Sequence, residues 1–120
     1  AEDALETALR ALELGQRTEN QDYIASAWRT LGLVASSFAE PILVGGEARD
    51  AAACFGESLR VFTEMGAEAE RARTLRDWAR YERGRGDAES GARMWRESRE
   101  IFSRLRIRHE LERMSREAGE

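Results

Sequence analysis

Four arginines at helical spacing are the residues of this sequence best suited to binding chemistry. Arg73, Arg76, Arg80 and Arg83 follow one another at intervals of three, four and three residues, so on a helix they form one stripe. We expect no acidic residue of the same helix to share it. A planar guanidinium donates paired hydrogen bonds to carboxylates and phosphates. The stripe predicts an anion-binding surface, although such arginines could equally be solvated or paired with acids of adjacent helices.

Catalytic and metal-binding chemistry has few candidates in this sequence. Cys54 and His109 are its single cysteine and single histidine, and the sequence places them on different helices. A nucleophile needs a base beside it, and a metal site needs about three or four ligands. The glycine pair Gly84 and Gly86 lacks the lysine and hydroxyl residue of a phosphate loop and is typical of a turn. We therefore predict no catalytic residue, no metal and no cofactor.

Composition favours an all-α protein. The 120 residues are 42% apolar and 35% charged, with one proline, as expected for helices that are each solvated on one side. All 19 basic residues are arginine, and the net charge of −4 argues against nucleic acid or an anionic membrane as the partner. The sequence has no run of about 18 apolar residues and no leader, and its lone cysteine suits a reducing compartment. We expect a cytoplasmic protein.

Apolar periodicity predicts six helices and one loop. Gly15 and Gly66 are expected to end the first and third helices, and Asp87 to cap the fifth. Residues 39–46 contain the only proline and the pair Gly45-Gly46, which predict a loop. The expected helices span residues 2–14, 23–38, 47–65, 69–83, 88–105 and 108–117.

Two parts of the sequence repeat each other. A shift of 40 positions superposes six identical residues over a short stretch. These are Gly46 on Gly86, Ala48 on Ala88, Ala52 on Ala92, Glu57 on Glu97, Ser58 on Ser98 and Phe62 on Phe102. The pattern indicates repeated helix pairs, which commonly stack into arrays that hold another molecule.

The repeat resembles that of tetratricopeptide repeat proteins over nearly the whole chain. The family's inner-helix pattern is matched by Trp28, Leu31-Gly32 and by Leu75, Trp78-Ala79. Its outer-helix pattern of small, aromatic and small residues is matched by Ala51, Phe55, Ser58 and by Gly91, Trp95, Ser98. Ala35 and Glu82 stand where the family usually has tyrosine, and the unit of about 40 residues exceeds the usual length of about 34. Longer units of this kind resemble those of large bacterial regulators.

The resemblance implies a right-handed α-solenoid of about six helices in a single domain. Residues 1–15 would form an unpaired outer helix, and residues 108–118 an unpaired inner one. Between them lie one repeat at 21–65, with a long loop at 38–46, and a second at 68–105. An array that begins on an outer helix and ends on an inner one suggests a piece of a larger protein. We expect the two unpaired terminal helices to allow a homodimer.

In tetratricopeptide proteins the inner helices line a concave groove. The resemblance places in that groove Arg29, Leu33, Arg73, Arg76, Arg80, Arg83, Arg113 and Arg116. The family's carboxylate-clamp members have asparagine where Leu33 and Arg80 stand, so their specificity for chaperone tails is not expected here. The tryptophans fall on packing positions of the repeat and are expected in the core rather than in a ligand cage.

The expected function is non-enzymatic protein binding, as a scaffold or sensing segment of a bacterial regulatory protein whose cationic groove takes an acidic peptide or a carboxylate. Two alternatives stay open: an intramolecular array that restrains another domain of the parent protein, and a small-ligand or enzymatic helical domain. Ile42, Leu43 and Val44 form an apolar loop, which could cover its own helix pair or contact a partner.

Overall fold

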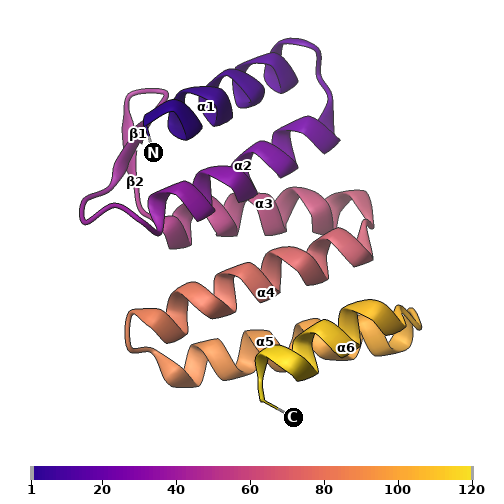
Figure 1. Cartoon of the computed structure of the whole chain (residues 1–120). Helices are drawn as coiled ribbons and strands as arrows, with labels where there is room; N and C mark the ends of the chain where they lie inside the picture. Colours follow the sequence, from indigo (N-terminus) through magenta and orange to yellow (C-terminus); the bar gives the residue numbers. More distant parts are fainter. Residues whose placement is uncertain (1, 120) are drawn as a thin grey trace. The chain divides into compact units, whose positions relative to one another are not determined.

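The computed structural model describes residues 2–119 and is mostly helical, as the composition predicted (Figure 1). The chain divides into two compact units, one up to Ala67 and one from Glu68 onward. The described residues form the helices α1 (Glu2–Arg17), α2 (Gln21–Ala35), α3 (Ala51–Met65), α4 (Glu68–Gly84), α5 (Ala88–Arg104) and α6 (Arg108–Glu117), and the strands β1 (Ile42–Val44) and β2 (Glu47–Arg49). None of these helices combines the length and the apolar character needed to cross a membrane.

The first unit begins with the helical hairpin of α1 and α2. Gly15 does not end α1, contrary to the prediction, because the helix continues to Arg17. A Cβ atom on Gly15 would lie 3.0 Å from the backbone nitrogen of Ile24 and 3.0 Å from the Cβ atom of Tyr23. The glycine therefore permits a close approach between the two helices. The second helix also differs from the prediction, since it stops at Ala35 rather than Phe38.

A β-hairpin joins α2 to α3, where the sequence predicted a loop at 38–46 and a helix from 47. The strands pair antiparallel, with Ile42 opposite Arg49 and Val44 opposite Glu47. Gly45 and Gly46 connect them with φ values of 60° and 85°, which is the geometry of a tight two-residue hairpin turn that glycine favours. The second part of the predicted loop and the first residues of the predicted helix thus form a two-stranded sheet.

The third helix begins later than predicted because Asp50 caps it. The Asp50 side chain accepts a hydrogen bond of 2.8 Å from the Ala53 backbone N–H, and the helix starts at Ala51. Phe55 of α3 packs so closely on α2 that a Cβ atom on Gly32 would lie 2.7 Å from its ring. Gly66, with a φ of 72°, ends the helix as predicted.

The second unit is built from α4, α5 and α6. Helices α4 and α5 form an antiparallel hairpin, in which a Cβ atom on Gly91 would lie 3.0 Å from the Ala79 carbonyl oxygen. The Ser98 hydroxyl donates a hydrogen bond of 2.7 Å to the Ala72 carbonyl. Asp87 caps α5 through the Ser90 backbone N–H at 3.1 Å, as predicted. Helix α6 has the predicted bounds.

Glu82 is a buried acidic residue near the end of α4. Its side chain is buried and accepts a hydrogen bond of 2.9 Å from the Trp78 indole N–H and one of 2.6 Å from Arg85 Nε. With two donors, this buried carboxylate is satisfied.

Candidate functional site

The predicted groove residues belong to both units. Arg29 and Leu33 lie on α2 in the first unit, where the Arg29 guanidinium is 5.5 Å from the centre of the Phe62 ring and Leu33 is 49% exposed. The other six arginines lie on α4 and α6 in the second unit. The candidate site is the face that α4 and α6 form in the second unit.

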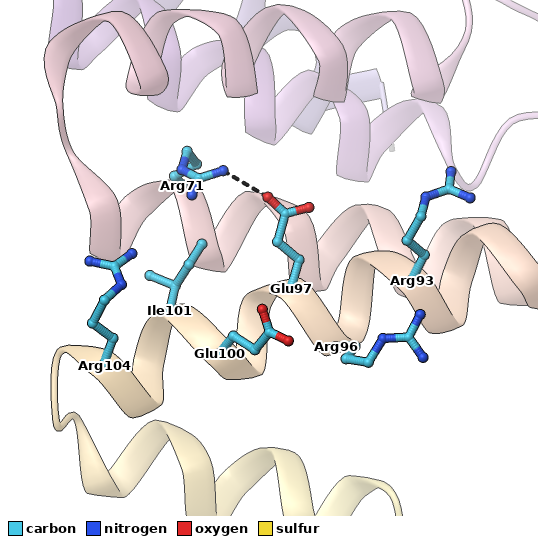
Figure 2. Close-up of a pocket in the computed structure, with 7 residues that line it drawn as sticks. All are labelled: Arg71, Arg93, Arg96, Glu97, Glu100, Ile101 and Arg104. Atoms are coloured by element: carbon cyan, nitrogen blue, oxygen red, sulfur yellow. Dashed lines mark hydrogen bonds and ion pairs between the residues drawn. The ribbon is translucent and has the colours of Figure 1, made fainter.

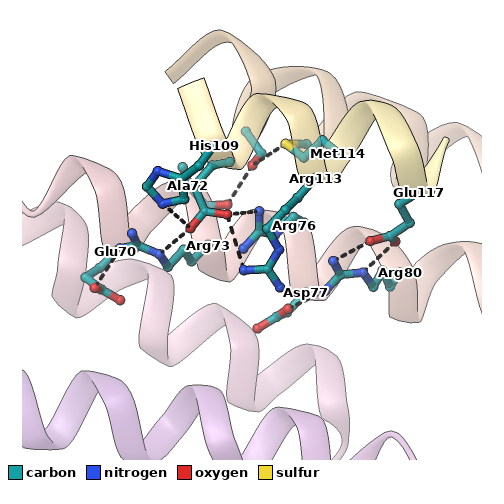
Figure 3. Close-up of polar contacts among 12 residues, drawn as sticks. Glu70, Ala72, Arg73, Arg76, Asp77, Arg80, His109, Arg113, Met114 and Glu117 are labelled. Carbon is teal, nitrogen blue, oxygen red and sulfur yellow. Dashed lines mark hydrogen bonds and ion pairs between the residues drawn. The ribbon is translucent and has the colours of Figure 1, made fainter. Parts of the chain in front are cut away.

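Glu110 on α6 joins α4 through two of the predicted arginines, Arg73 and Arg76, which are labelled in Figure 3. Arg76 Nη1 donates to Glu110 Oε1 at 2.7 Å, and Arg73 Nε donates to Glu110 Oε2 at 3.1 Å. Arg113, one turn along α6, stands 3.7 Å from the same carboxylate. Arg76 and Glu110 are 6% and 3% exposed, so this pair forms a buried link between the helices.

Arg80 and Glu117 form a second link in the same direction. Arg80 Nε and Nη2 each donate to a different Glu117 oxygen at 2.6 Å, a two-pronged guanidinium–carboxylate contact. The residues of this pair are 37 apart in sequence, as are those of the Arg73–Glu110 pair. Helices α4 and α6 therefore run parallel in the second unit, with α5 connecting them.

Acidic residues of α4 itself also contact the stripe, which contradicts the expectation of an acid-free stripe. Glu70 lies 2.8 Å from Arg73, and Asp77 lies 2.8 Å from Arg80. Each acid precedes its arginine by three residues, a spacing at which helical side chains are neighbours. The long arginine side chains reach sideways to these carboxylates, so the stripe is partly neutralised within its own helix.

Ion pairing lowers the pKa of both α6 carboxyls. Burial alone would raise the pKa of Glu110, but hydrogen bonds from Arg76 and Arg73, together with their charges, outweigh it and bring the pKa below its ordinary value. The hydrogen bond from Arg80 lowers the pKa of Glu117 and outweighs the opposing effect of burial. Both carboxylates are consequently charged at neutral pH.

The remaining arginines of the face are exposed. The Arg83 guanidinium lies 5.0 Å from the centre of the Trp95 ring, a cation–π distance. Within residues 2–119 neither Arg83 nor Arg116 has a carboxylate at ion-pairing distance, and Arg113 is exposed beside its long contact to Glu110. The six predicted arginines of α4 and α6 thus meet four carboxylates among the described residues, those of Glu70, Asp77, Glu110 and Glu117.

A second cationic surface, which the sequence reading missed, lies along α5 (Figure 2). A pocket of about 410 Å³ is lined by Arg71, Arg93, Arg96, Glu97, Glu100, Ile101 and Arg104. Arg71 donates to Glu97 at 2.9 Å and also pairs with Glu68, as does Arg104. The three-residue spacing of Arg93 and Arg96 is the feature of the sequence that could have predicted this surface. Neither arginine has a carboxylate at ion-pairing distance among the described residues.

The predicted apolar loop residues are divided between the interior and the surface. Ile42 and Val44 are 6% and 7% exposed, whereas Leu43, between them on β1, is 67% exposed. This alternation follows from the pleat of a strand, which points successive side chains to opposite sides. The strand covers its own unit with two residues and presents the third to solvent.

Cys54 and His109 lie on different elements, as predicted. Cys54 is buried in α3, and burial raises the pKa of its thiol to about 11. His109 is exposed on α6, 4.0 Å from Glu110. No group of three or more metal-ligating side chains lies close together in the described part of the chain.

Charge is distributed unevenly between the two units. The sequence from residue 68 onward has 14 arginines and 12 acidic residues, whereas residues 1–67 have five arginines and 11 acidic residues. The α4–α6 face therefore belongs to the positive part of a negative chain. The chain matches no protein-family model, no curated protein and no solved structure.

Proposed function

We propose that this chain is a non-enzymatic protein-binding module of tetratricopeptide-like helix pairs, and that its α4–α6 face binds an acidic segment or a carboxylate of a partner. The observation that carries the proposal is the surplus of guanidinium groups on that face, six against four carboxylates. An arginine without an acidic partner keeps its paired donors for a ligand.

The six arginines divide into two roles. Arg73, Arg76 and Arg80 hold α6 beside α4 through Glu110 and Glu117. Arg83, Arg113 and Arg116 are exposed and supply the positive charge that meets the ligand. Exposed charges at the edge of a binding surface affect the rate of association and its salt dependence more than they affect the affinity.

Helix packing in the second unit supports the tetratricopeptide assignment. Gly91, a small residue of α5, allows a close approach to α4. In addition, α4 runs parallel to α6. Successive inner helices of such arrays are parallel, and each outer helix is antiparallel to both. A module of this type would serve as the sensing or scaffold segment of a larger bacterial regulator in the cytoplasm, where the free thiol of Cys54 would stay reduced.

The test is the binding of a fluorescein-labelled peptide rich in aspartate and glutamate, measured by anisotropy at about 50 mM and about 200 mM NaCl. The double variant Arg83→Glu with Arg116→Glu should weaken binding by about tenfold, roughly 1.4 kcal/mol, and flatten the salt dependence. Circular dichroism should show an unchanged fold, since both side chains are exposed.

The matched control is Arg93→Glu with Arg96→Glu, which makes the same change of charge on α5. Binding that falls only in the first variant supports the α4–α6 face. Binding that falls only in the control assigns the peptide to the α5 pocket instead. An equal fall in both variants indicates non-specific attraction, and an unchanged affinity in both rejects the cationic face.

A further inference from the structure

The first unit contains a pocket that the proposed protein-binding face does not use. It lies between α1, α2 and the β-hairpin and has a volume of about 560 Å³. That volume is within the range of small-molecule sites, about 300–1,000 Å³. The β-hairpin supplies one wall of the pocket, so the cavity depends on the hairpin that connects α2 to α3. About half of the lining is apolar, formed by Leu9, Leu12, Trp28, Leu43 and Val44.

Arg49 gives this pocket a polar anchor. Its guanidinium lies 4.9 Å from the centre of the Trp28 ring, which fixes the group against an aromatic wall. Within residues 2–119 its one hydrogen-bond acceptor is the exposed Glu47 carboxylate, at 3.3 Å. The Arg49 Nε atom is buried and has no acceptor in the part of the chain that the structure describes. The Arg49 side chain is nevertheless 29% exposed, so a ligand can reach this guanidinium, whose donors lack sufficient acceptors, and its oxygen would be stabilised there.

Charge around the pocket decides the kind of acceptor. Glu13 and Glu47 line it together with Arg49, so its charged side chains sum to −1. The surrounding unit is acidic as well, with 11 acidic residues and five arginines in residues 1–67. An anionic ligand would meet this field and compete with Glu47 for the guanidinium, whereas a neutral oxygen would not.

We propose that the pocket binds a small uncharged molecule with an apolar body and one carbonyl-type oxygen. The body packs against Leu9, Leu12 and Val44, and the oxygen accepts a hydrogen bond from Arg49. Leu43, 67% exposed at the hairpin, also lines the pocket and contributes apolar surface to the ligand. The site is independent of the α4–α6 face, because every residue that forms it lies in the first unit.

Three matched probes test the ligand class in the intact chain: 1-indanone, indane and indane-1-carboxylate. They share one apolar body and differ in having a carbonyl, no acceptor or a negative charge. Binding is followed by NMR through the Trp28 indole N–H and the Arg49 Nε–H at equal probe concentrations. We expect millimolar binding of 1-indanone, about fivefold tighter than indane, with the carboxylate weaker than the ketone. The proposal is overturned if none of the probes perturbs these two groups, if indane equals the ketone, or if the carboxylate binds most tightly.

Variants at exposed leucines separate binding from folding. Leu43→Ser should weaken 1-indanone binding at least about threefold, because the side chain lines the pocket without being part of the core. Leu14→Ser on α1 makes the same substitution at a residue that is 43% exposed and does not line the pocket, so binding should be unchanged. Equal binding by the parent and both variants would contradict the site. So would an equal loss in both.

Discussion

Arg76 on α4 and Glu110 on α6 form a buried ion pair, with 2.7 Å between Nη1 and Oε1. The Arg76 guanidinium also lies 5.3 Å from the centre of the Phe102 ring, so both an aromatic face and a carboxylate surround it. Met114 is the fully buried apolar side chain of the short helix α6. Attachment of α6 consequently depends on this pair as well as on apolar packing.

Glu110→Ala should destabilise the second unit by about 3 kcal/mol, because it leaves the Arg76 charge buried without its main partner. Urea unfolding monitored by circular dichroism measures this loss. Hydrogen exchange should show that α6 loses protection first.

Glu112→Ala is the matched control on the same helix, since Glu112 is exposed. Its effect should stay within about 0.5 kcal/mol. Equal effects of the two substitutions would show that the buried pair contributes no more than a surface residue does.

The low pKa of Glu110 predicts acid sensitivity. A carboxyl whose pKa is lower in the folded than in the unfolded chain stabilises the fold above its ordinary value of 4.5, and this stabilisation is lost as pH falls through the folded pKa. The free energy of unfolding should therefore decrease as pH falls below about 4.5, with a shallower decrease in Glu110→Gln. Urea titrations at a series of pH values test this, with Glu112→Gln expected to follow the parent chain.

Gly32→Ala should destabilise the first unit by about 1–3 kcal/mol. The added methyl group would lie 2.7 Å from the Phe55 ring, and Phe55 is fully buried and cannot withdraw. Thermal unfolding measures the effect. Gly84→Ala is the comparison, because apart from its chain neighbours and the backbone of its own helix no described atom lies within 4 Å of a Cβ there. Alanine also favours the helix, so this change should be neutral or slightly stabilising. The packing explanation fails if Gly32→Ala is as mild as Gly84→Ala.

Cys54 should react slowly with thiol reagents in the folded chain. Burial raises the pKa of the thiol to about 11, so at pH 8 about one molecule in a thousand carries the reactive thiolate. The rate of reaction with Ellman's reagent should rise by orders of magnitude in urea, where the thiol regains its ordinary pKa and becomes accessible. Equal rates in the two conditions would mean that Cys54 is not buried in solution.

Local signals in the sequence predicted most of the helices. Asp87 and Gly66 act within a few residues of a helix end, so their positions alone located the start of α5 and the end of α3. Gly15 misled the prediction because glycine serves two purposes. It can end a helix, or it can allow a neighbour to approach, and only the position of Ile24 distinguishes them.

The hairpin and the ion pairs were beyond such local signals. Strands β1 and β2 are three residues long each, too short for periodicity to separate them from a loop. Glu110 lies 34 residues from Arg76, so their contact depends on which helices become neighbours. Counting acids along α4 alone therefore overestimated how much positive charge the stripe leaves for a ligand.

The two ion-pair links between α4 and α6 also determine the direction and the axial position of α6 on α4. Glu110 and Glu117 are seven residues apart, as are their partners Arg73 and Arg80. Sliding α6 by one turn, or reversing it, would bring carboxylates against the wrong side chains and leave Arg76 buried without a counter-charge. Apolar surfaces tolerate small slips, whereas this spaced pattern of opposite charges does not. The spacing of these ion pairs fixes the register of α6 on α4, much as paired residues fix the register of two strands. It permits one orientation and one axial position of α6.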